Sequence, residues 1–176
     1  MAKTAFTTDS PFFADSSGIL CWPGGQGRCA LGKGGVATPE AKQEGDGATP
    51  LGVWPMRQVF WRSDRLQRPV TGLPVDALIP EAGWCDDPAS PLYNFPVALP
   101  FAFNHEKLWR EDGVYDILVV LGYNDDPPFP GKGSAIFLHI ARPDYGPTEG
   151  CVACAREDLL ALLARAKLGD ALAITA

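Results

Sequence analysis

The chain has 176 residues, a length that fits one domain, residues 1–176, and leaves little room for a second. Hydrophobic residues make up 46% and charged residues 20%, which excludes disorder, collagen and a coiled coil as descriptions of the whole chain. The net charge of -6 excludes a basic surface for nucleic acid, and no apolar run approaches the ~20 residues needed for a transmembrane segment.

Glycine and proline set the expected fold class. The chain has 19 glycines and 17 prolines, about a fifth of all residues against a usual ~12%. Such frequent turn formers favour many short strands over long helices. We therefore expect a mainly β protein and exclude a helix bundle.

The N-terminal third predicts short strands around one long loop. Residues 1–16 are expected to form a loosely held arm, with Phe12 and Phe13 as its anchors. Residues 18–31 predict two short strands joined by a glycine-rich turn, and residues 53–61 predict a further strand. The polar stretch between them has no periodicity, and loops of that length within a domain are usually functional or disordered.

The remaining chain predicts two buried strands, a helix and a last strand. Residues 69–100 are too rich in proline for any long element, whereas residues 114–123 and 133–141 are apolar strand candidates. After Cys151 the pattern becomes helical, with Leu159, Leu162 and Leu163 on one face and Gly169 at the end. Residues 171–175 then predict a strand.

One cysteine and one histidine could form a catalytic pair. His139 follows the apolar run AIFL, so it is expected at the end of a buried strand, twelve residues before Cys151. Cys151 comes just before the predicted helix, whose dipole would favour the thiolate that attacks carbonyl groups. Gly150 allows a backbone shape in which consecutive amides point at one spot. Together these residues are the minimal requirement for cysteine acyl transfer.

Other interpretations of these residues stay open. His139 could be a hydrogen-bonded core histidine, and Cys151 a packed thiol, like most of the five cysteines. Cys151 and Cys154 form a C-x-x-C motif, which could hold a dithiol or, with His139 and a fourth ligand, zinc. A papain-like enzyme is excluded, because there the cysteine precedes the histidine.

The segment HIARPDYGPTEGCVA closely resembles the active-site segment of the L,D-transpeptidase catalytic domain (YkuD-like) family. KQEGDGATPLGVW, GWCDDP, YNFPVALPF, LWREDGVYDILVVLGYND and GSAIFLHIARPDY resemble one branch of stand-alone, single-domain members, so the resemblance covers residues 18–175. It implies a curved two-sheet β-sandwich with one or two short helices. It also implies Cys151 as nucleophile, His139 as base, the Ile140 carbonyl as the group that fixes the imidazole tautomer, and the Gly150 and Cys151 amides as the oxyanion site.

The chain departs from the family pattern at two positions. Glu149 stands where many members have a second histidine, and Ala153 where they have an arginine that handles the substrate carboxylate. Replacements could come from Arg142, Arg156, Arg57, Arg62, Arg65 or Arg68, although these arginines are equally well explained as a solvated basic strip. The substrate contacts expected from the loops beside the reacting pair are Tyr123, Asn124, Thr148 and Glu149.

The resemblance implies a peptidoglycan L,D-transpeptidase that forms a thioester with a donor stem peptide and passes it to an acceptor stem at diaminopimelate. Alternatives are an L,D-carboxypeptidase that hydrolyses the same bond, and a non-catalytic peptidoglycan-binding module. No metal or cofactor is expected, and carbapenems are expected to acylate Cys151. The substrate implies the periplasm or cell envelope, but no signal peptide is visible in MAKTAFTTDSPFFADSSG, which by itself suggests the cytoplasm.

Overall fold

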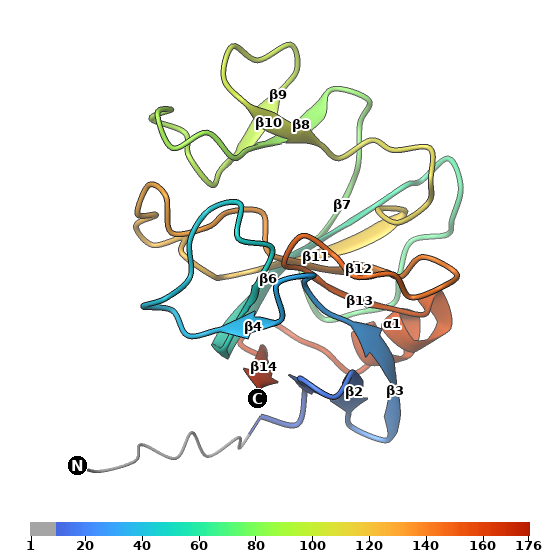
Figure 1. The fold of residues 1–176 in the computed structure, drawn as a ribbon. Helices are drawn as coiled ribbons and strands as arrows, with labels where there is room; N and C mark the ends of the chain where they lie inside the picture. The colour runs from blue at the N-terminus through green and yellow to red at the C-terminus, as the bar shows by residue number, and fades with distance from the viewer. Residues whose placement is uncertain (1–9) are drawn as a thin grey trace, which may run out of the picture.

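The computed structural model describes residues 10–176 as a mainly β protein with one helix (Figure 1). The order and bounds of its elements are β1 (Phe13–Asp15), β2 (Ile19–Trp22), β3 (Gly25–Ala30), β4 (Val36–Ala37), β5 (Thr49–Pro50), β6 (Gly52–Trp61), β7 (Val75–Ala77), β8 (Ala82–Cys85), β9 (Pro96–Ala98), β10 (His105–Lys107), β11 (Ile117–Leu121), β12 (Phe137–Ile140), β13 (Val152–Cys154), α1 (Arg156–Leu163) and β14 (Ala171–Thr175).

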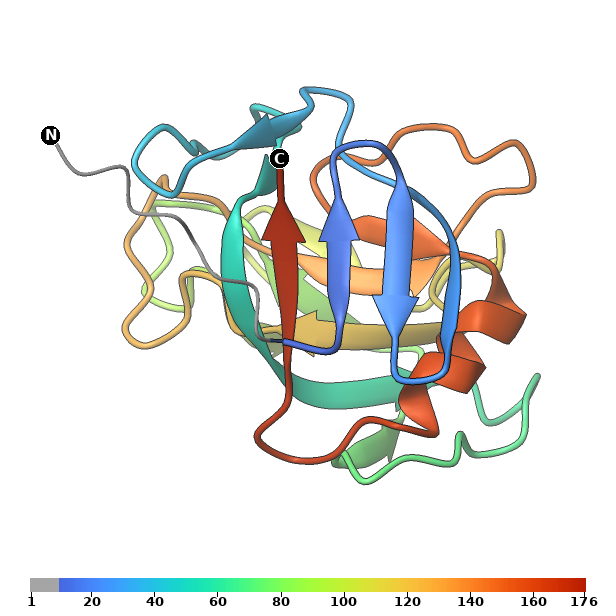
Figure 2. The same ribbon diagram turned by 90° about the horizontal axis from the view of Figure 1, so that it is seen from below.

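Most strands belong to one nine-stranded sheet of order β11-β12-β13-β3-β2-β1-β14-β6-β7, in which β11 also pairs with β6. This additional pairing closes the sheet into a barrel-like ring. It depends on β6, whose first half pairs with β14 and whose second half pairs with β11 and β7. Figure 2 shows this long teal strand running beside the red β14 and then bending beneath the sheet.

The mainly β class with one short helix is confirmed, whereas the main sheet is closed and barrel-like and is not clearly the expected two-sheet sandwich. The physical reason is the length of β6, which has ten residues and passes from one set of partners to another without a break. A closed sheet leaves no unpaired edge there, whereas a sandwich would need two separate sheets.

The barrel interior holds the larger apolar core. Strand β11 is buried along its whole length, as its apolar sequence predicts: Ile117, Val119 and Leu121 belong to the interior core. Its alternate residues, Leu118 and Val120, face a second core on the outside of the barrel. A small three-stranded sheet of order β10-β8-β9 lies over this outer face (Figure 1).

The N-terminus of the described chain is part of the barrel. Residues 1–9 of the expected arm lie outside the described residues, but Phe13–Asp15 forms β1 between β14 and β2. Phe12 is 1% exposed, so its burial fixes this segment on the core. The anchoring role predicted for Phe12 agrees with this, whereas residues 10–16 are not a loose arm.

The helix begins where the sequence predicts it, after Cys151, but it ends at Leu163, before the expected end at Gly169. Its buried residues are Leu159, Leu162 and Leu163, and they face the interior core. In the part of the chain that the structure describes, no helix is long and apolar enough to cross a membrane.

Candidate active site

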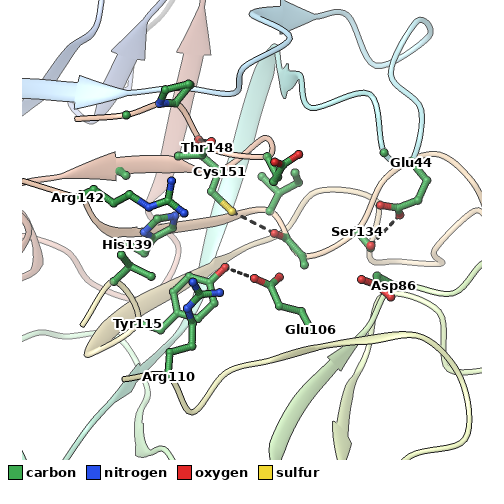
Figure 3. Close-up of a pocket in the computed structure, with 18 of the residues that line it drawn as sticks. Glu44, Asp86, Glu106, Arg110, Tyr115, Ser134, His139, Arg142, Thr148 and Cys151 are labelled. Carbon is green, nitrogen blue, oxygen red and sulfur yellow. Dashed lines mark hydrogen bonds between the residues drawn. The ribbon is translucent and has the colours of Figure 1, made fainter. Parts of the chain in front are cut away.

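Two neighbouring parallel strands bring Cys151 and His139 to one face of the sheet. Strands β12 and β13 pair in the register Leu138↔Val152 and His139↔Ala153. Because side chains alternate along a strand, Leu138 and Val152 point into the barrel, whereas His139 and Cys151 point to the outer face. The two reactive side chains therefore line the same cavity (Figure 3).

His139 is held as a neutral imidazole with one free nitrogen. Its Nδ1–H donates to the Ile140 carbonyl at 2.9 Å, as the sequence predicted, so Nε2 is left as a base. The pKa of His139 is lowered to about 4, mainly by burial and also by the charges of Arg110 and Arg142, against the opposing effects of the Ile140 hydrogen bond and Asp112. The Tyr115 ring packs edge-on against the imidazole, with centroids 5.0 Å apart.

Cys151 is held as a neutral thiol. Its Sγ donates to the Ala135 carbonyl at 3.2 Å and accepts from the Phe137 N–H at 3.3 Å. Burial raises the pKa of the thiol to about 12, and the negative charge of Glu106 is the next cause. The hydrogen bond from the Phe137 N–H and the positive charge of Lys42 oppose this increase of the pKa.

The expected effect of the helix dipole on Cys151 is wrong. Strand β13 separates Cys151 from the start of α1 at Arg156, a gap of roughly 10 Å of extended chain. The field of a helix terminus falls off within one turn, so it does not stabilise this thiolate.

A packed loop positions the nucleophile. Thr148 Oγ1 donates to the Cys151 carbonyl at 2.7 Å and accepts from the Gly150 N–H at 3.1 Å. Gly150 has φ +136°, and a Cβ atom there would lie 2.9 Å from the Ala48 carbonyl oxygen. Its amide is thus committed to Thr148, which leaves the Cys151 amide as the candidate oxyanion donor of the two that the sequence suggested.

The cavity at this face has a volume of about 410 Å³. Its walls come from the long loop before β5, from the three-stranded sheet and from β12 and β13 (Figure 3). Its charged side chains are Lys42, Glu44, Asp86, Glu106, Arg110, Arg142 and Glu149.

A model of the YkuD family, the L,D-transpeptidase catalytic domain, matches residues 12–174, nearly the whole chain. The chain belongs to this family. No curated protein matches the chain, and no solved structure matches it either. The resemblance predicted from the segment around His139 and Cys151 is thereby confirmed, and the domain is an L,D-transpeptidase-family catalytic domain for which the family implies a peptidoglycan substrate.

Three of the residues predicted to contact substrate line the cavity of this YkuD domain. They are Arg142, Thr148 and Glu149, of which Glu149 also forms an ion pair of 2.8 Å with Lys33. Arg142 lies beside His139 in Figure 3. Its side chain takes part in no ion pair among residues 10–176.

Tyr123 and Asn124, both expected to contact substrate, instead hold the backbone of a loop. The Tyr123 hydroxyl donates to the Lys132 carbonyl, and the Asn124 amide donates to the carbonyls of Phe129 and Gly133. Neither residue lines the cavity.

Arg57, Arg62 and Arg65 also lie outside the cavity of the nucleophile. Arg57 pairs with Asp125 and Arg65 with Asp116, each at 2.9 Å. Arg62 is 3% exposed and lies 3.5 Å from the centre of the Trp109 ring. Their partners are carboxylates and an aromatic ring of this chain, which explains why the arginine run does not form a binding strip.

Sequence reasoning missed the wall opposite the nucleophile, formed by Glu44, Asp86, Glu106 and Tyr115. The segments that contain Glu44, Asp86 and Tyr115 were part of the family resemblance, whereas Glu106 lies between two of those segments, and nothing in the local pattern of any of them indicated a site. The Tyr115 hydroxyl donates a hydrogen bond to Glu106, nine residues away in sequence, and this contact forms only in the tertiary structure.

The C-x-x-C motif does not form a joint site. Cys154 is 0% exposed and belongs to the interior core, on the opposite face of β13 from Cys151. Among residues 10–176, no group of three or more His, Cys, Asp and Glu side chains could hold a metal ion. The structure therefore gives no support to the dithiol and zinc interpretations.

Proposed function

We propose that the protein is a cysteine-dependent L,D-transpeptidase that cross-links peptidoglycan stem peptides at diaminopimelate. The observation that carries this proposal is the placement of Cys151 and His139 on one wall of a single cavity in a YkuD domain. The tetrapeptide stem is the donor, and a neighbouring stem is the acceptor. This substrate would place the protein in the periplasm or cell envelope.

In the first step, Cys151 attacks the carbonyl of the L-centre of diaminopimelate. The free Nε2 of His139 accepts the thiol proton as the C–S bond forms, then returns it to the amine of the departing D-alanine. Since burial disfavours both charged forms, proton transfer accompanies the attack and does not precede it. The Cys151 amide would stabilise the oxyanion, and one such donor is worth about 10²–10³ in rate.

Arg142 is the candidate group for the substrate carboxylate. Many family members have an arginine at the position of Ala153. Arg142 would take over the role of that arginine from a different position in the chain. Its place beside His139 and its lack of an ion pair among residues 10–176 support this role.

The test is the intact mass of the protein after incubation with a carbapenem and, separately, with a tetrapeptide donor. We expect a covalent adduct on the wild type, none on Cys151→Ala, and an unchanged adduct on Cys21→Ser, a matched thiol variant outside the cavity. No adduct on the wild type would leave only a peptidoglycan-binding module. A digest of muropeptides resolved by mass then separates cross-linked product from the hydrolysed stem that an L,D-carboxypeptidase would release.

A further inference from the structure

A carboxylate lines the wall of the cavity opposite the nucleophile. Glu106, in β10, lines the same cavity as Cys151, and the Tyr115 hydroxyl donates to its Oε1 at 2.5 Å. The Tyr115 ring packs edge-on against His139. Glu106 is therefore linked through Tyr115 to the catalytic histidine, and Figure 3 shows Tyr115 hydrogen-bonded to Glu106 below His139.

The cations of the cavity are largely engaged elsewhere. Lys42 forms an ion pair with Asp46 at 2.7 Å, and Arg110 forms one with Asp112 at 2.5 Å. Each of these two basic side chains thus has its ion-pair partner outside the carboxylate wall, and the charge of Arg110 still acts on Glu106.

The carboxylates of that wall lack such partners. Within residues 10–176, no ion pair includes Glu44, Asp86 or Glu106. One buried oxygen of Asp86, Oδ1, has no hydrogen-bond partner in the structure. A wall of three carboxyl groups without ion-pair partners, across the cavity from a nucleophile, favours a substrate that brings a positive charge.

The second half of a transpeptidation has such a substrate. An amine acceptor arrives as an ammonium ion and must lose a proton before its nitrogen can attack the thioester. A second proton leaves the nitrogen after the attack, and His139 can accept only one of the two. Water as acceptor needs a single base, so only transfer to an amine needs a second one.

We propose that Glu106 binds the ammonium group of the acceptor and takes its first proton, which directs the acyl-enzyme to transfer in preference to hydrolysis. This inference rests on the proposed function. Tyr115 holds the carboxylate at the cavity wall, and Glu44 and Asp86 add to the negative potential that attracts the acceptor. The ligand class is a primary ammonium ion on a stem peptide.

The proposed step balances in protons and electrons. Glu106 accepts a proton from the ammonium ion, and the freed nitrogen lone pair forms the C–N bond as the carbonyl π electrons move to oxygen. His139 Nε2 accepts the second nitrogen proton. The oxyanion then collapses, the C–S bond breaks, and His139 returns its proton to the Cys151 sulfur. Glu106 finally releases its proton to water.

The environment of Glu106 suits this task. Burial is the largest cause that raises its pKa above the usual value, and Asp86 and Glu44 raise it further, whereas the Tyr115 hydrogen bond and Arg110 oppose the shift. A carboxylate with a raised pKa is a stronger base, closer to the amine from which it takes the proton.

The experiment compares Glu106→Gln with wild type, using a tetrapeptide donor and two acceptors. One acceptor is a stem with the free side-chain amine of diaminopimelate, and the other is hydroxylamine, which is largely unprotonated at neutral pH. We expect Cys151 to be acylated no more slowly than in wild type, because Glu106 raises the pKa of the thiol and its neutral replacement removes that effect. The ratio of amine transfer to hydrolysis should fall by about tenfold or more, while transfer to hydroxylamine persists. Glu81→Gln, on the exposed surface, is the matched control.

Three outcomes would overturn the inference: an unchanged transfer ratio, an equal loss of transfer to hydroxylamine, or a loss of Cys151 acylation in Glu106→Gln. Wild type itself provides a test that does not depend on the folding of a variant. An acceptor with a trimethylated amine should block transfer competitively and leave acylation intact, and an N-acetylated acceptor should not; equal inhibition by both would also refute the inference. If wild type forms no acyl-enzyme, the proposed function fails instead.

Discussion

At the scale of single residues, both members of the catalytic pair, Cys151 and His139, are uncharged. Burial raises the pKa of Cys151 to about 12 and lowers that of His139 to about 4, so both side chains are neutral at physiological pH. Their positions in the sequence and the family resemblance identified this pair, because His139 follows an apolar strand and Cys151 lies in the segment that resembles the family's active site. Their charge states could not be predicted, because they depend on burial and on Glu106, which is distant in sequence.

The neutral state of His139 predicts how stability depends on pH. The unfolded chain takes up a proton on this imidazole near pH 6.5, while the folded chain takes it up only near pH 4. Protons therefore favour the unfolded state in this window, and the free energy of unfolding should decrease by about 3 kcal/mol as the pH falls from 6.5 to 4. His139 should stay unprotonated, and the acylation rate should therefore be maintained, down to about pH 4.

The measurement is urea unfolding over this pH range for wild type and His139→Asn. The variant lacks the titrating group, so its free energy of unfolding should decrease less steeply, and the difference between the two curves isolates His139 from all other groups. Parallel curves, or an acidic limb of the acylation rate near pH 6.5, would contradict the low pKa of the folded state.

At the scale of elements, the site is built where two strands end and one loop crosses them. The apolar runs predicted the strands around residues 117–121 and 137–140, and leucine spacing predicted the helix. Closure of the barrel was not predictable from these runs, because the bend of β6 and its exchange of partners depend on strands far away in sequence. The same holds for Gly150, whose contact with the loop at Ala48 is not visible in either segment alone.

The packed loop at Gly150 predicts a strong effect of one added methyl group. In Gly150→Ala the side chain must take φ +136° and press on the Ala48 carbonyl, so we expect a loss of about 1–3 kcal/mol of stability. The shift of the nucleophile should slow Cys151 acylation by about tenfold or more, as judged by the time course of the adduct mass.

The control for this substitution is Gly169→Ala. Gly169 has φ +97° but no atom within 4 Å of the added carbon, and it lies after the helix. It should therefore lose stability through backbone strain alone and acylate at the wild-type rate. Equal acylation by both alanine variants would show that the Ala48 contact does not position the nucleophile.

At the scale of the whole molecule, the cavity exists because segments that are distant in sequence meet at one side of the barrel. Glu44 of the long loop accepts from the Tyr93 hydroxyl at 2.5 Å and from Ser134 Oγ at 2.7 Å, and Tyr93 in turn accepts from the Gly133 N–H. Figure 3 shows Glu44 and Ser134 bonded at the far wall. The sequence predicted that the long loop is either functional or disordered, and its partners follow only from the assembled fold.

These hydrogen bonds predict that the buried hydroxyl of Tyr93 holds the long loop in place. Tyr93 is 2% exposed, and Tyr93→Phe leaves the Gly133 N–H without its acceptor and Glu44 with one donor fewer, which should cost about 1–3 kcal/mol of stability. Amide hydrogen exchange over residues 38–48 should become faster, and Cys151 acylation slower, because Ala48 and Glu44 both belong to that loop.

Tyr145→Phe is the matched control, since among residues 10–176 its hydroxyl forms no hydrogen bond and its ring contacts Arg28. It should change stability by less than about 0.5 kcal/mol. Faster exchange spread evenly over the barrel strands of Tyr93→Phe, with no excess in residues 38–48, would mean that Tyr93 stabilises the fold as a whole and does not hold the loop.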